Sequence, residues 1–178
     1  MSGLHRAFVA VVPPPSVRAW ADAAAHPAEL LVPDLRWTRA EQRHITLQFL
    51  GPVADPAPVA EFVADAVRGR APFTLSLGGG GAFPDARHAS VLWLGVREGL
   101  DALTALATAL ASPDDRPFRA HFTLARANKP RDLRQAIAAL DASGESESWT
   151  VDEVVLFDSE NRADRSTHTE QARFRLVG

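Results

Sequence analysis

The sequence predicts a globular α+β fold built on antiparallel sheets and held together without disulfides. Segments with the character of strands outnumber segments with helical periodicity, and they often follow one another in pairs. The chain has 178 residues, of which 46% are hydrophobic and 23% charged, so it can bury a sizeable core. It contains no cysteine, which excludes a disulfide framework, a thiolate nucleophile and a zinc site with cysteine ligands. The length suits one domain, or two small lobes that share a cleft.

The first half of the chain alternates strands and helices. Residues 7–12 form an apolar run that ends at three consecutive prolines, which predicts a buried strand over residues 6–12. Ser16 is a suitable cap for an alanine-rich helix, and Gly51 with Pro52 is expected to end the second long strand. In order, we expect strand 6–12, helix 16–29, a short extended piece at Trp37, strand 43–50 and helix 57–68.

The second half continues with more strands than helices. Residues 78–81 are four consecutive glycines between two strand-like segments. They lack the Lys-Ser/Thr pair of a P-loop and do not open a helix, so we interpret them as a flexible turn. In order, we expect strand 72–77, strand 89–96, helix 98–111, strand 118–126, helix 131–140, strand 149–157 and strand 172–177.

One internal repeat carries the chemistry. The tetrapeptide His-x-Thr-Leu, with an apolar x, occurs at 44–47 and again at 121–124, both inside expected strands. Alternate residues of a strand point to the same face, so each copy presents a histidine and a threonine on one face. In the first copy the opposite face includes Phe49, which we expect to pack into the core beside Ile45 and Leu47. Two such strands facing each other place two imidazoles and two hydroxyls around one cleft.

This combination of side chains suits the chemistry of a phosphodiester. Because the unperturbed pKa of histidine is about 6.5, one neutral imidazole can take a proton from an attacking water while a protonated one donates to the leaving oxygen. The hydroxyls of Thr46 and Thr123 can donate to phosphate oxygens and stabilise the charge of the transition state. The scheme needs neither a metal nor a cofactor. Two histidines can also ligate a metal ion, but no third ligand at fitting spacing accompanies His44 and His121.

Arg126 follows the second copy of the repeat by two residues. Strict alternation puts it on the buried face with Phe122 and Leu124, where an arginine is unfavourable. We therefore expect that the strand ends or bulges before Arg126, or that the side chain turns into the cleft. There it can bind phosphate through a charge-assisted contact. A solvated surface position is the alternative.

The charged and aromatic residues indicate which kinds of substrate the cleft can bind. The net charge is −3 and the pI is about 6.1, which does not support a globally basic nucleic-acid-binding protein, yet arginines cluster around both copies of the repeat. Phe8, Trp37 and Phe83 are candidates for stacking on a nucleobase, with core packing as the alternative. His168 lies in a polar segment and is interpreted as a surface residue, with a place in a substrate loop as the alternative.

The chain carries no segment that predicts export or membrane insertion. The apolar run at 7–12 is too short for a membrane span and lacks a cleavage site, and no uncharged apolar stretch of about 18 residues occurs elsewhere. We expect a cytoplasmic protein without membrane contact and without an obligate protein partner.

The motifs resemble those of the two-His phosphoesterase superfamily, and among them those of the RNA 2′,3′-cyclic phosphodiesterases, also called 2′-5′ RNA ligases. Residues 36–38 with 44–51 are similar to the first motif of that family and its approach. Residues 121–126 are similar to the second motif, including its trailing arginine. Weaker similarities concern the opening strand and the central hairpin of the family, at 6–10, 81–84 and 91–96.

The resemblance implies one two-lobed α+β domain over residues 1–178 with pseudo-twofold symmetry. Each lobe is then an antiparallel sheet with helices outside, and the active cleft lies between the lobes. The implied activity is hydrolysis of a 2′,3′-cyclic phosphate at an RNA end to a 2′-phosphate, with 2′-5′ joining of RNA as the reverse reaction. In that scheme His44 is the proton donor and His121 the proton acceptor. Thr46, Thr123 and Arg126 match the phosphate-binding positions.

Other functions stay open at this point. The same superfamily includes cyclic phosphodiesterases that act on small nucleotides of the ADP-ribose cyclic phosphate type, and a weakly active RNA-binding module is a further alternative. The intact histidine and threonine of both copies argue against a binding module, because binding alone does not need two matched imidazoles. The family commonly carries a tyrosine in the C-terminal segment, where this chain has His168. The substrate contacts of that segment therefore cannot be carried over.

Overall fold

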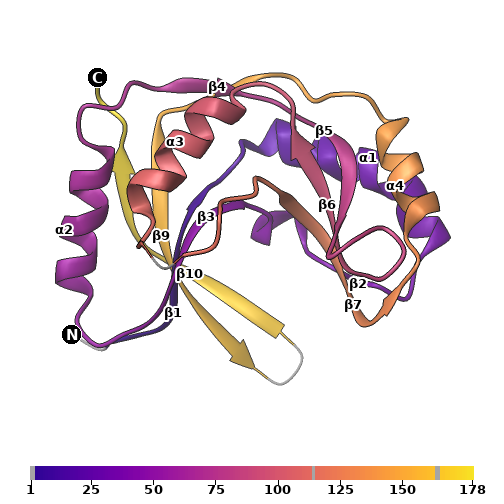
Figure 1. The fold of residues 1–178 in the computed structure, drawn as a ribbon, viewed down its shortest axis with the longest axis horizontal. Helices are drawn as coiled ribbons and strands as arrows, with labels where there is room; N and C mark the ends of the chain where they lie inside the picture. The colour runs from indigo at the N-terminus through magenta and orange to yellow at the C-terminus, as the bar shows by residue number, and fades with distance from the viewer. Residues whose placement is uncertain (1–2, 114, 163–164) are drawn as a thin grey trace.

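The fold combines one large antiparallel sheet with helices, as Figure 1 shows. The computed structural model describes residues 3–113, 115–162 and 165–178. Within these residues the large sheet has eight strands, a second sheet has two, and four α-helices pack against them. The predicted α+β class with antiparallel sheets is thus confirmed. No helix in the described ranges is long and apolar enough to cross a membrane.

One half of the large sheet carries the first copy of the repeat. Its strands are, in spatial order, β10 (Arg165–Arg175), β9 (Glu153–Arg162), β1 (Leu4–Val11) and β3 (Ile45–Val53). The prediction that Gly51 and Pro52 end β3 is wrong, because the register with β1 shifts here and Pro52 needs no partner in the ladder. The last strand is also much longer than the predicted 172–177. The polar residues 165–171, which the prediction left outside the strand, therefore belong to the sheet.

The other half carries the second copy. Its strands are β7 (Phe122–Arg131), β6 (Ala89–Val96), β5 (Leu77–Phe83) and the short β2 (Arg36–Trp37), which pairs with β7. The two halves meet at one residue pair, Ile45 on β3 with Phe122 on β7. Each half corresponds to the antiparallel sheet expected for one lobe. The pair Ile45–Phe122 joins the two halves into one continuous sheet.

The turn predicted for residues 78–81 is wrong, because these glycines lie inside β5. A Cβ at Gly81 would overlap the indole ring of Trp93, which crosses over it from β6. Gly79 has a φ of 74° at a shift in the register between the two strands, a bulge position that favours glycine. These glycines therefore allow side chains of neighbouring elements, such as Trp93, to pack closely against the backbone of β5.

Helices cover the outer face of both halves (Figure 1). Helix α1 lies beside α4 against the half that contains β5, whereas α2 lies beside α3 and the pair contacts β10 and β3. The expected strands 72–77 and 149–157 are each interrupted, and their outer parts form the small sheet of β4 and β8. The remaining bounds are α1 (Pro15–Leu31), η1 (Ala40–Gln42), α2 (Pro56–Val67), β4 (Phe73–Leu75), α3 (Leu100–Leu110), α4 (Arg134–Asp141) and β8 (Trp149–Val151).

The apolar residues of both repeat copies anchor their strands. Ile45 and Phe122 have no exposed surface, and Leu47 and Leu124 belong to the same hydrophobic core. Because these side chains fix which face of the sheet is inside, the histidine and threonine of each copy face the other side.

Candidate active site

A cleft of about 1300 Å³ lies on the side of the sheet that carries the polar residues of the repeat. Its lining comes from strands of both halves and from the segment around η1, and no lining residue belongs to α1, α2, α3 or α4. The structure brings all five predicted site residues to this cleft: His44, Thr46, Thr123, His121 and Arg126. They meet there because Ile45 and Phe122, the residues next to the two histidines, are direct partners in the sheet.

His44 is the more enclosed of the two histidines. Its Nδ1 donates to the carbonyl oxygen of Gln42 at 2.7 Å, and its Nε2 lies 3.1 Å from the hydroxyl of Thr46. Its ring stacks on Phe8 with the ring centroids 4.8 Å apart and meets His168 edge-on at 5.3 Å. Burial, with the positive charges of the cleft, lowers the pKa of His44 from 6.5 to about 4, against the raising effect of its bond to the Gln42 carbonyl.

His121 has a matching backbone bond and different neighbours. Its Nδ1 donates to the carbonyl oxygen of Arg119 at 2.6 Å, and the ring of Phe83 meets it edge-on at 4.9 Å. Burial lowers the pKa of His121, and the charges of Arg126 and Arg119 act in the same direction. A carbonyl can only accept, so Nδ1 carries the proton in both rings. Near pH 7 both imidazoles are therefore neutral, and each has the lone pair on Nε2.

A bulge follows the threonine in both copies of the repeat. Leu47 is the extra residue in β3 opposite β1, and Leu124 is the extra residue in β7 opposite β6. An extra residue shifts the alternation of side chains by one. The fifth residue after each histidine thereby joins the threonine on the cleft side, and these residues are Phe49 and Arg126.

Arg126 enters the cleft by way of this bulge, which is one of the routes that the sequence predicts. It is the register partner of Arg36 on β2, and Arg6 on β1 is a further charged neighbour. Burial lowers the pKa of Arg126 and the two other guanidinium groups add to this, but an arginine stays protonated near neutral pH. Among the described residues these three arginines have no ion-pair partner, and the cleft lining contains no aspartate or glutamate. The cleft is therefore suited to an anion.

Phe49 is 67% exposed and lines the cleft, so the prediction that it packs in the core is wrong. Strict alternation puts Phe49 on the buried face, but the bulge at Leu47 moves it to the cleft face. This bulge arises from the pairing of β3 with β1. Phe8, a predicted base-stacking residue, has one ring face against His44 and the other against Phe157, at 4.8 and 5.2 Å. It has no face left for a nucleobase. Phe49 is the most exposed aromatic residue of the lining.

The other two predicted base-stacking residues are also partly covered. Trp37 is half-buried and donates its indole N–H to the carbonyl oxygen of Val32 at 3.3 Å. The ring of Phe83 carries the guanidinium of Arg119 at 4.5 Å from its centroid. These contacts hold the rings in place and reduce the area that they offer to a ligand.

His168 is a half-buried residue of the cleft wall, so its interpretation as a surface residue is wrong. It lies on β10, 5.1 Å from the ring of Phe8 and 5.3 Å from that of His44. Burial lowers the pKa of His168, and the charge of Arg6 adds to the effect. The sequence indicates the cleft position of His168 only weakly, because a strand made mostly of polar residues resembles a loop.

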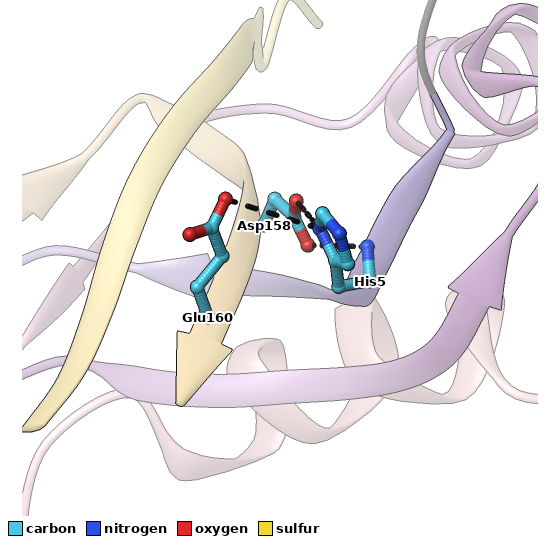
Figure 2. Close-up of side chains that lie close together, drawn as sticks. All are labelled: His5, Asp158 and Glu160. Atoms are coloured by element: carbon cyan, nitrogen blue, oxygen red, sulfur yellow. Dashed lines mark hydrogen bonds and ion pairs between the residues drawn. The ribbon is translucent and has the colours of Figure 1, made fainter. Parts of the chain in front are cut away.

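Asp158 on β9 holds the beginning of β1, as Figure 2 shows. One carboxylate oxygen accepts the backbone N–H groups of His5 and Arg6, at 2.8 and 3.0 Å, and the other lies 3.2 Å from Nδ1 of His5. Burial raises the pKa of Asp158, but these hydrogen bonds outweigh it and the pKa is lowered. Glu160 completes a group of three potential metal-ligand side chains. Because the backbone already occupies Asp158, we interpret the group as a clamp that fixes the position of Arg6.

Known proteins share this sequence pattern and this fold. The chain matches the model of the 2′-5′ RNA ligase superfamily over residues 13–163. It is 33% identical over 135 residues to the RNA 2′,3′-cyclic phosphodiesterase of Geobacillus stearothermophilus, covering 71% of this chain and 43% of that protein. It is 31% identical over 154 residues to the RNA 2′,3′-cyclic phosphodiesterase of Methanothermobacter thermautotrophicus, covering 80% and 83%.

The solved structures agree with this similarity. The crystal structure of LigT from E. coli in apo form superimposes with a TM-score of 0.74 at 27% identity, covering 99% of this chain and 100% of that one. The match to the Geobacillus protein spans less than half of that relative's length, whereas the match to the Methanothermobacter protein spans most of it.

Proposed function

Because the chain belongs to the 2′-5′ RNA ligase superfamily, we propose that it hydrolyses a 2′,3′-cyclic phosphate at the end of an RNA to a 2′-phosphate. The observation that carries the proposal is the pair of imidazoles in one cleft. Each is held by a backbone carbonyl through Nδ1, and arginines without ion-pair partners in the described structure lie beside them. The names of the relatives support the same reaction.

In the proposed mechanism the two histidines act on opposite sides of the phosphorus. Nε2 of His121 takes a proton from a water molecule whose oxygen forms a bond to phosphorus. The bond between phosphorus and O3′ breaks, and O3′ takes a proton from Nε2 of His44. The products are a 2′-phosphate and a 3′-hydroxyl. Thr46 and Thr123 donate to the non-bridging oxygens and Arg126 binds them by charge, so that the developing negative charge is stabilised.

The low pKa of His44 bears directly on its role as the acid. In the free protein His44 is neutral near pH 7 and cannot donate a proton from Nε2. A phosphate anion bound beside it raises its pKa, because an opposite charge favours the protonated form. Once protonated, a buried imidazole is a stronger acid than a solvated one, which assists departure of O3′.

The joining of two RNA ends uses the same groups in the same roles, with a different nucleophile. A 5′-hydroxyl of a second RNA takes the place of water and attacks the cyclic phosphate, which forms a 2′-5′ linkage. In this direction His121 again removes the proton from the attacking oxygen and His44 again donates to O3′.

The terminal nucleoside is expected on the side of His44, since O3′ leaves toward that residue. Phe49 lies on the same half of the sheet and exposes its ring to the cleft. We therefore assign Phe49 as the surface on which the terminal base stacks. Base stacking on an aromatic side chain tolerates any base, so strong base preference is not expected from this contact.

A product assay tests the proposal. An RNA with a 2′,3′-cyclic end is incubated with the protein, and the position of the phosphate in the product is determined by ³¹P NMR. We expect a 2′-phosphate, formed also in the presence of EDTA. Faster turnover of ADP-ribose cyclic phosphate than of RNA would favour the small-nucleotide alternative, and binding of RNA without turnover would favour the binding module.

Two further parts of the proposal concern the whole chain. We propose that residues 1–178 act as one two-lobed domain, since the site takes residues from both halves; either half expressed alone should then lack activity. A cytoplasmic location is part of the same proposal, and cell fractionation tests it.

A further inference from the structure

Among the described residues of the β9–β10 hairpin, no aspartate or glutamate lines the cleft. His168 on β10 is the register partner of Ser159 on β9, and both line the cleft. The residues on either side of Ser159 are Asp158 and Glu160, which belong to the other face of the strand by alternation. Figure 2 shows these two carboxylates together with His5, and none of the three lines the cleft. The cleft face of the hairpin thus offers an imidazole and a hydroxyl.

The ring of His168 is held in one orientation. Its centroid is almost equally far from Phe8 and His44, at 5.1 and 5.3 Å, and its plane is nearly perpendicular to both rings. Because Phe8 and His44 are themselves stacked, His168 lies beside the stack and not at its end. The hydroxyl of Ser159 makes no hydrogen bond within the described residues, and the residue is 7% exposed. Within the described residues, neither the imidazole of His168 nor this hydroxyl has a hydrogen-bond partner.

The two nitrogens of His168 differ. Nδ1 is buried and has no hydrogen-bond partner in the described part of the chain, whereas Nε2 is not buried and the residue lines the cleft. A buried N–H without an acceptor is more unfavourable than a buried lone pair. The neutral ring therefore carries its proton on Nε2, which makes the side chain a hydrogen-bond donor toward the cleft.

A positive charge, that of Arg6, lies within electrostatic reach of this donor. Arg6 lowers the pKa of both His168 and Arg126 by its charge, so it lies within electrostatic reach of each. Its backbone is held by Asp158, its side chain is exposed at the cleft, and among the described residues it has no ion-pair partner. The hairpin is tied down as well, because the side chain of Gln42 donates to the carbonyl oxygen of Ser166 at 2.6 Å. The backbone segments that carry the donor and the charge are therefore both tied down.

We propose that His168, Ser159 and Arg6 form a second anion site, which binds the phosphodiester on the 5′ side of the terminal nucleotide. The inference rests on the proposed function, which places the terminal ribose on the side of His44. The next phosphate of the chain is one ribose away, and His168 is the next ring beyond His44 on that side. This site would make the enzyme prefer an RNA chain over a free nucleoside 2′,3′-cyclic phosphate, which has no phosphate at that place.

The experiment compares three substrates with the same cyclic end, two of which differ only in the charge of this phosphate. One is a nucleoside 2′,3′-cyclic phosphate with a free 5′-hydroxyl, the second is a dinucleotide with the same cyclic end, and the third is that dinucleotide with a neutral methylphosphonate linkage. In the wild type we expect kcat/KM for the charged dinucleotide to exceed the other two by about tenfold or more, the size of one hydrogen bond to a charged group.

The variants His168→Phe and Arg6→Gln test which groups are responsible. His168→Phe keeps a ring beside Phe8 and His44 but removes the donor, so its loss of kcat/KM should be about tenfold larger on the charged dinucleotide than on the mononucleotide or on the neutral linkage. Arg6→Gln should reduce the preference for the charged dinucleotide and its dependence on salt. Arg175→Gln, an exposed arginine near the far end of β10, is the matched control and should leave the preference unchanged.

The outcomes separate this inference from the proposed function. Equal kcat/KM for the charged and the neutral linkage in the wild type would overturn the second anion site while hydrolysis itself stands. Equal losses on all three substrates in His168→Phe would make His168 a packing residue of His44 only. If the wild type hydrolyses none of the substrates, the proposed function fails; calorimetric binding of the two dinucleotides then still decides the site, since weaker binding of the neutral linkage supports it and equal binding contradicts it.

Discussion

The two copies of His-x-Thr-Leu share a backbone and differ in what surrounds it. In both, Nδ1 of the histidine donates to the carbonyl two residues earlier, and a bulge after the threonine turns the fifth residue into the cleft. That fifth residue is Phe49 in one copy and Arg126 in the other. A duplicated strand thus supplies two equivalent positions on the cleft, and in the proposed mechanism the side chain at one position stacks on a base while the other binds phosphate.

The histidines differ in the same way. His44 has aromatic rings on two sides, Phe8 and His168, and its pKa falls to about 4. His121 has Phe83 at its edge and stands between the charges of Arg119 and Arg126. The comparison teaches that a repeated motif need not give two equivalent catalytic groups, because the neighbours set the proton affinity of each.

The largest expected effect is the loss of either imidazole. His44→Ala and His121→Ala should each lower kcat by about 100- to 10,000-fold, the usual range for a general acid or base. The double variant should lose less than the product of the two single losses, because the pair acts as a unit. Steady-state rates on an RNA with a cyclic end measure this. His88→Ala, at an exposed histidine outside the cleft, is the control, and unimpaired turnover in either single variant would contradict the mechanism.

The next effect concerns Arg126. Arg126→Met should lower kcat/KM by about 10- to 100-fold, because a charge-assisted hydrogen bond to phosphate contributes about 1.5 to 3 kcal/mol. The loss should be the same for a mononucleotide and for RNA, since both carry the cyclic phosphate. The same kinetics in variant and wild type would make Arg126 a solvated residue.

At the equivalent position, Phe49→Ala should lower kcat/KM by about tenfold on substrates that carry a base, within the range of one stacking contact. On ribose 2′,3′-cyclic phosphate without a base the variant should equal the wild type. Phe49→Trp should retain activity, and Phe62→Ala, at a half-exposed phenylalanine of α2, is the matched control. An equal loss with and without the base would show that Phe49 supports the fold and not the base.

The pH profile distinguishes the free site from the occupied one. The proposed mechanism needs His121 deprotonated and His44 protonated, and both pKa values lie below 6.5 in the free protein. The optimum of kcat/KM, which reports the free protein, should therefore lie on the acid side of pH 6.5. The optimum of kcat should lie at higher pH, because the bound phosphate raises both pKa values. Profiles of kcat/KM centred above pH 6.5 would show that burial does not control these groups.

The smallest expected effect is on stability. The pKa of His44 is lower in the folded protein than in the unfolded chain, so its neutral form stabilises the fold above pH 6.5, and this contribution is lost as the pH falls toward 4. The loss is at most about 3 kcal/mol. Urea denaturation at several pH values should show that the free energy of unfolding of His44→Gln depends less on pH in this window than that of the wild type. A constant difference between the two proteins would contradict the burial of His44.

The alternation of polar and apolar residues within each strand was enough to predict the central residues of the candidate site. His44, Thr46, His121 and Thr123 lie where strand alternation places them, because their apolar neighbours have to be buried. For Arg126 the sequence left three possibilities, namely that the strand ends, that it bulges, or that the side chain turns into the cleft. The structure shows a bulge. Phe49 was missed for the same reason that Arg126 was ambiguous: a bulge depends on the register with β1 or β6, which no single strand encodes.

Long-range packing explains the other differences. Four consecutive glycines indicate a turn by local rules, but Gly81 serves to accommodate Trp93 from the next strand. His168 belongs to a strand whose partner is β9, and its polar neighbours hide the alternation. In both cases the structure of the segment depends on a contact with a residue from another strand.

The central claim is that His44 donates the proton and His121 accepts it, and a substrate with sulfur in place of O3′ tests it most directly. A thiolate leaves without the help of an acid, so the His44→Ala variant should recover most of the wild-type rate on this substrate. His121→Ala should stay as impaired as on the oxygen substrate, because the water still needs a base. Recovery of His121→Ala alone would reverse the assignment, and recovery of neither variant would contradict acid–base catalysis by this pair.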